Sequence, residues 1–96
     1  GLKLQDVRRS EEKIYARVYE EIGFLDQKHQ IALENYKLYG ELVASARDLE
    51  IAGEKTIYDV QTLENSRETM GLDAQIYAID KQLALLDLYA KMQGEI

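Results

Sequence analysis

Apolar residues recur with helical spacing along almost the whole chain, interrupted once by a short polar break. Between residues 4 and 49 they advance by alternating steps of four and three, which is the heptad spacing of one helix face. The same spacing returns from residue 57 onward. The pattern therefore predicts two long helices, over about residues 3–52 and 57–93, joined by a turn at residues 53–56.

The break itself carries signals for the end of one helix and the start of the next. Gly53 can take the left-handed conformation that ends a helix, because it has no Cβ. Thr56 can accept a backbone N–H of the second helix, and Asp59 can bond back to Thr56. Asp59 also places negative charge at the positive end of that helix. A stop and a start within about four residues predict an antiparallel hairpin.

Each predicted helix carries two apolar seams, although one per helix is enough to close a hairpin. The surplus is expected to face other helices, since a wide apolar arc in water is an association surface. We therefore expect an all-α fold: a long antiparallel two-helix coiled-coil hairpin that completes a helical bundle or α-barrel by oligomerisation. The first seams are Val18, Ile22, Leu25, His29, Ala32, Tyr36, Tyr39, Val43 and Ala46, then Val60, Leu63, Met70, Ala74 and Tyr77; the second seams are Phe24, Ile31, Leu38, Leu42 and Leu49, then Leu72, Ile76, Ile79, Leu83, Leu86 and Ala90.

The position of the turn fixes the expected pairing of the two arms. With its centre at Glu54 and Lys55, residues whose numbers add to about 109 should face each other, within a residue or two. Leu25 should then lie near Ala84. The interior glycines Gly23, Gly40 and Gly71 are expected to mark close helix contact or slight bending, because each costs about 1 kcal/mol relative to Ala.

Composition narrows the possible partners. The chain has 96 residues, a net charge of −6, six Gly and no Pro, Cys or Trp. The acidic balance argues against nucleic acid or anionic lipid as the main partner. No apolar run approaches the roughly 18 residues of a membrane span, so we expect no direct membrane contact by this segment. Residues 1–13 are too charged for a signal peptide, so the protein is either cytoplasmic or has its targeting region elsewhere.

The turn and the arm after it resemble the TolC family of outer-membrane efflux and secretion channels. The matching residues are Ala52-Gly53, a polar pair, Thr56, a hydrophobic pair and Asp59-Val60, followed by about 35 mixed heptad residues that end in Gly94. The incoming arm fits through Val18-Tyr19 and Phe24-Leu25. The sequence departs from the family at Glu50, where Tyr is frequent, and at Thr62, where a second acidic residue is found.

The resemblance implies a trimeric channel in the outer membrane of a Gram-negative bacterium, with helical hairpins that form a hollow α-barrel across the periplasm. The hairpin tips of that family close the entrance of the duct and dock onto a periplasmic adaptor protein. By position, this implies a tip site formed by Gly53, Glu54, Lys55, Thr56 and Asp59. The family's membrane β-strands are absent from this sequence, so the resemblance implies an excised portion that would have no channel activity of its own.

The residues of the tip also have simpler structural interpretations. Asp59 is first a capping residue, while Glu54 and Lys55 are solvated turn residues. His29 lies on a seam with only Asp26 near it, which falls short of a metal site. No nucleophile–base pair, phosphate-binding loop or metal-ligand spacing is present, so we expect no enzyme activity and no cofactor.

Two alternative functions remain open. One is the α-hairpin of a periplasmic adaptor (membrane fusion) protein, whose tip has a different Arg, Leu and Ser pattern. The other is a soluble dimerisation module that forms a four-helix bundle. Whichever of the three functions holds, the isolated chain is expected to bury its surplus stripe against a second copy, most simply as an antiparallel four-helix dimer.

Overall fold

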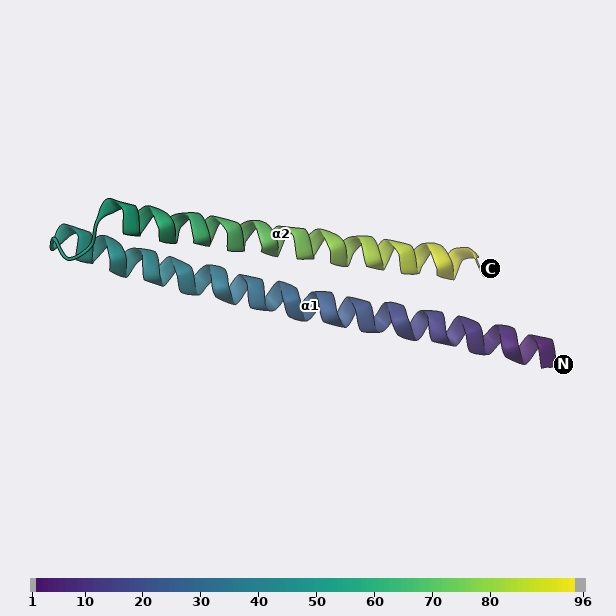
Figure 1. The fold of residues 1–96 in the computed structure, drawn as a ribbon. Helices are drawn as coiled ribbons and strands as arrows, with labels where there is room; N and C mark the ends of the chain where they lie inside the picture. The colour runs from purple at the N-terminus through teal and green to yellow at the C-terminus, as the bar shows by residue number, and fades with distance from the viewer. Residues whose placement is uncertain (1, 95–96) are drawn as a thin grey trace.

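The chain folds into two long antiparallel helices joined by a tight turn (Figure 1). The computed structural model describes residues 2–94, and the side chains of residues 4–94. Helix α1 spans Leu2–Ile51 and helix α2 spans Ile57–Gly94. The hairpin measures 77 × 17 × 14 Å, so its cross-section is only two helices wide. The expected all-α antiparallel hairpin is confirmed.

One heptad seam on each helix, the first seam of the sequence pattern, packs against the other helix and closes the hairpin. We call it the inner seam. Six of its seven buried members recur every 14 residues, or two heptads, along each helix, and the seventh is Val43. Three of the seven are alanine, whose small side chain lets two helices approach closely. The remaining first-seam residues are half-buried, apart from Tyr36 at 38% exposure. The buried members at this spacing are Val18, Ala32 and Ala46 on α1 and Val60, Ala74 and Leu88 on α2.

The register of the hairpin is read from three contacts between the helices. Lys81 donates a hydrogen bond to Asp26, Arg67 lies against Gly40, and Tyr36 lies against Gly71. The residue numbers in each pair add to 107 instead of 109, within the expected tolerance. The pairing is thus centred on Gly53 and Glu54, one residue earlier than expected, because the chain already reverses at Gly53.

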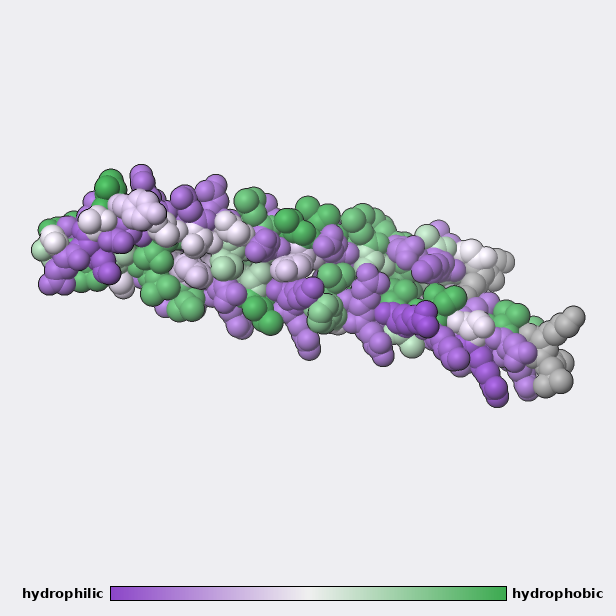
Figure 2. Space-filling model, viewed as in Figure 1, coloured by the Kyte–Doolittle hydropathy of each residue, from purple (hydrophilic) through white to green (hydrophobic). Residues whose placement is uncertain are grey.

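The second apolar seam of α2 is exposed and faces away from α1. Each member follows a residue of the inner seam by two positions, as Ile76 follows Ala74, which is a rotation of about 200° around the helix. Hydrophobic side chains gather along this edge of α2 in Figure 2. We call this surface the outer stripe; its members are 53–64% exposed, and they are Leu72, Ile76, Ile79, Leu83 and Leu86.

The second seam of α1 is also exposed, with Phe24, Ile31 and Leu38 each more than half accessible. The amino-terminal end of α1 projects beyond the end of α2 in Figure 1, and Leu4 and Val7 there are exposed as well. An extended hairpin with so many exposed hydrophobic side chains suggests self-association.

Candidate functional site

The end of α1 is closed by the backbone of the turn. Gly53 adopts a positive φ of 81°. Its N–H donates to the Glu50 carbonyl at 2.9 Å, and the N–H of Glu54 donates to the Leu49 carbonyl at 2.8 Å. This pair of bonds is the Schellman arrangement, which satisfies carbonyls that the end of a helix leaves without partners. The expected left-handed glycine stop is confirmed.

The start of α2 is closed by a reciprocal cap between Thr56 and Asp59. The backbone N–H of Asp59 donates to Thr56 Oγ1 at 3.3 Å, while the backbone N–H of Thr56 donates to Asp59 Oδ2 at 3.0 Å. The Thr56 hydroxyl donates to the same carboxylate oxygen, also at 3.0 Å. This is a capping box with Asp in the place usually held by Glu, as the sequence predicted.

The cap also tunes the acidity of Asp59. The backbone N–H of Thr56, and then its hydroxyl, stabilise the charged carboxylate and hold the pKa of Asp59 below its usual value. Lys55 adds a smaller attraction in the same direction. Asp59 therefore carries its negative charge at neutral pH, at the positive end of α2.

The surface of the tip combines charge with apolar side chains. Glu54 and Lys55 are exposed between the two helix ends, together with Gly53 and Thr56. Beside them, Ile51 is 87% exposed, Ile57 63% and Tyr58 75%. Sequence reasoning named the polar tip residues and missed these three apolar ones. The available signal was that they flank the turn outside both inner seams, where no helix of the hairpin covers them.

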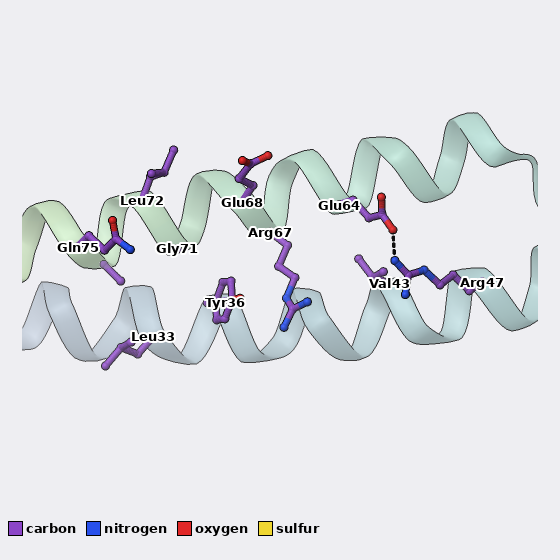
Figure 3. A pocket seen from close by; sticks show the side chains of 11 residues that line it. Leu33, Tyr36, Val43, Arg47, Glu64, Arg67, Glu68, Gly71, Leu72 and Gln75 are labelled. Carbon is purple, nitrogen blue, oxygen red and sulfur yellow. Dashed lines mark hydrogen bonds and ion pairs between the residues drawn. The ribbon is translucent and has the colours of Figure 1, made fainter.

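A second feature, a groove of about 630 Å³, lies along one side of the hairpin between the helices, at residues 33–47 and 64–75. Figure 3 shows Arg67 reaching from α2 toward α1, beside Tyr36. The Arg67 guanidinium lies over the Tyr36 ring, 4.5 Å from its centroid, in a cation–π contact. Nearer the turn, Arg47 forms an ion pair with Glu64 across the same groove.

Two glycines make room for these large side chains. A Cβ at Gly40 would lie 3.1–3.2 Å from the Arg67 guanidinium, and one at Gly71 would lie 3.1–3.2 Å from the Tyr36 ring. Each helix therefore seats a long seam residue of the other helix against a glycine, and close helix contact explains both glycines. Gly23 has no neighbour of this kind within 4 Å, so the same explanation does not apply to it.

Arg67 has an unusual electrostatic position in the groove. Within the described part of the chain, its Nε–H is buried and has no hydrogen-bond acceptor. Glu64, the carboxylate across from Arg47, is already paired with that residue. Buried polar atoms normally have a hydrogen-bonded partner, so the Nε–H of Arg67 is an unused donor in a mostly apolar setting, although the guanidinium also contacts the Tyr36 ring.

His29 is half-buried on the inner seam, and no group of three or more His, Cys, Asp or Glu side chains within residues 4–94 could hold a metal ion. Over the same range, neither helix is long and apolar enough to cross a membrane.

Comparisons of the chain with protein-family models, with curated proteins and with solved structures gave no match. The fold and the geometry of the tip and groove therefore carry the functional inference.

Proposed function

We propose that this hairpin is a wall element of a periplasmic export duct of the TolC type. Its tip would dock onto an adaptor protein and help to close the duct. The supporting observation is that α2 has apolar seams on two nearly opposite sides, with α1 covering only one of them. A helix of this kind is suited to a curved or flat row of helices, in which every helix has a neighbour on each side.

The tip supports the docking part of the proposal. Its backbone is fixed by the Schellman bonds and the capping box, and side chains of both chemical types project from it. Ile51, Ile57 and Tyr58 would supply apolar contact, while Glu54 and Lys55 would supply charge. Partner surfaces are commonly carried by such loops on rigid scaffolds. The proposed tip site therefore comprises Gly53, Glu54, Lys55, Thr56 and Asp59 with these three apolar neighbours.

Grafting of the hairpin into a known channel tests the proposal. Residues 2–94 would replace the corresponding hairpin of a TolC-family channel, which would be expressed in a strain that lacks its own channel. We expect export of a toxic dye to be restored and the tip to crosslink to the adaptor. The matched control carries Ile57→Ser and Tyr58→Ser, which should reduce crosslinking while leaving the trimer intact.

A graft that assembles at normal levels but gives neither export nor adaptor crosslinking would contradict the proposed duct function. The exposed stripe also fits a soluble four-helix-bundle dimerisation module, and that result would favour the module. An adaptor-type hairpin would instead be indicated if the graft restored function only when placed in the adaptor of the same pump.

A further inference from the structure

Among the described residues the Arg67 guanidinium contacts the Tyr36 ring but pairs with no carboxylate, and α2 carries an apolar stripe edged by carboxylates. We propose that these two surfaces bind each other between copies of this chain. The groove of one hairpin would seat the outer stripe of the next, and Asp80 of that second copy would pair with Arg67.

The charges of the two surfaces are complementary, which favours the outer stripe of a second copy as the occupant of the groove. Asp73, Asp80 and Asp87 recur every seven residues along one edge of the outer stripe. Asp87 is already paired with Lys91 at 3.1 Å, whereas Asp80 is exposed and has no partner among residues 4–94. The groove offers the complementary group, since the Arg67 side chain lines it and forms no ion pair with a carboxylate among residues 4–94. A carboxylate and a guanidinium form a strong, directional pair when both are withdrawn from water.

The groove and the outer stripe also match in length and in the position of their charged residues. The groove extends along α1 from Leu33 to Arg47, and the outer stripe extends along α2 from Leu72, which also borders the groove, to Leu86. The two stretches span the same number of residues, so each is about 21 Å long at a helical rise of 1.5 Å per residue. Arg67 lies at the middle of the groove beside Gly40, and Asp80 lies at the middle of the stripe beside Ile79. Centring one surface on the other therefore brings the unpaired charges to the same level.

The same carboxylates disfavour the simpler alternative, in which two outer stripes pack against each other. In an antiparallel pairing of identical stripes, the same edge of each helix faces its counterpart, so the Asp edges would meet. Like charges facing each other across a helix interface are destabilising. A groove-to-stripe contact avoids this repulsion, and because it joins unlike surfaces it can be repeated from one copy to the next.

This inference deepens the proposed wall function and rests on it for its biological setting. Its test uses the chain in solution, while the wall function is tested by grafting, so each can fail without the other. The groove variants are Arg67→Met, which keeps an apolar stem but removes the cation, and Leu33→Gln on the exposed groove wall. The stripe variant is Leu83→Gln with Leu86→Gln. Circular dichroism checks that each remains helical.

Sedimentation equilibrium would be measured for each variant alone and for equimolar mixtures. We expect both groove variants and the stripe variant to be monomeric at concentrations where the unmodified chain associates. A mixture of Leu33→Gln with the stripe variant should form a one-to-one pair, because each still has the surface that the other lacks. Asp80→Asn should weaken self-association about tenfold, and Asp87→Asn much less.

Three results would overturn the inference. Groove variants that associate as well as the unmodified chain would show that the stripe packs on another surface, such as a second stripe. A mixture that stays monomeric would show that the two surfaces do not bind each other. Equal effects of Asp80→Asn and Asp87→Asn would remove the pairing assigned to Arg67.

Discussion

Lys81 Nζ on α2 donates a 2.7 Å hydrogen bond to Asp26 Oδ1 on α1, joining residues that are 55 positions apart in the chain. Both side chains are partly accessible, at 33% and 46%. The bond from Lys81, together with its charge, holds the pKa of Asp26 below the usual value. This pair links the two arms midway along the hairpin and fixes their register at that level.

The lowered pKa predicts a pH dependence. Since the folded state favours the Asp26 carboxylate, the pair stabilises the hairpin at pH values well above about 4, the pKa of an unperturbed Asp. That stability is lost as the pH falls from there through the lower folded-state pKa. Asp26→Asn should therefore unfold at lower urea concentration than the unmodified chain at pH 7, and this difference should shrink as the pH is lowered below about 4. The exchanged pair Asp26→Lys with Lys81→Asp should recover part of the loss at pH 7; a loss independent of pH would contradict this role.

The glycines differ in what an added methyl group would meet. Gly23→Ala should stabilise the hairpin by about 1 kcal/mol, because the position is open and Ala is the better helix former. Gly53→Ala should destabilise it by about 1–2 kcal/mol, since its φ of 81° is unfavourable for any residue with a Cβ. The two opposite shifts would be measured by thermal unfolding at one protein concentration. Equal effects at the two positions would argue against the left-handed turn.

Gly40 and Gly71 should also respond differently to alanine. At Gly40 the new methyl group meets the end of the flexible Arg67 side chain, which can move aside. At Gly71 it meets the stiffer Tyr36 ring. We expect Gly71→Ala to be less stable than Gly40→Ala in urea unfolding. Adding Tyr36→Leu should relieve most of the difference, and a failure of this rescue would remove the proposed steric cause.

Sequence reasoning succeeded where local chemistry decides the structure. Gly53, Thr56 and Asp59 form the stop and cap that their residue types predict, because these bonds close within a few residues. The heptad spacing likewise separated the seam that closes the hairpin from the outer stripe. A strict repeat over many turns leaves little freedom in which face is buried.

The sequence did not reveal those contacts that depend on which side chains the two arms place opposite each other. Arg67 and Lys81 lie on the inner seam at heptad spacing, but as charged residues they were not counted among its members. Whether such a residue finds an acceptor depends on what the other helix places opposite it. Lys81 meets Asp26, whereas Arg67 meets a ring and a glycine. The groove and its unpaired donor therefore became visible only in three dimensions.

The cap at the start of α2 gives a prediction for the tip. Thr56→Ala removes the hydroxyl that pairs with Asp59 and should destabilise the hairpin by about 1 kcal/mol. It should also raise the pKa of Asp59 toward the usual value, because one of the two donors from Thr56 is lost. The carboxyl carbon of Asp59, followed by NMR through a pH titration, would report this directly. Thr56→Ser keeps the hydroxyl and serves as the control; an Asp59 pKa unchanged by Thr56→Ala would contradict the capping account.

The hairpin leaves a second apolar face exposed, and we propose that another hairpin covers it. Sedimentation equilibrium of the unmodified chain, from low to high micromolar concentration, tests it most directly. We predict reversible self-association that Leu83→Gln with Leu86→Gln abolishes while helicity is retained, because the outer stripe is the surface that becomes buried. A chain that remains a stable, fully helical monomer at high micromolar concentration would contradict the claim.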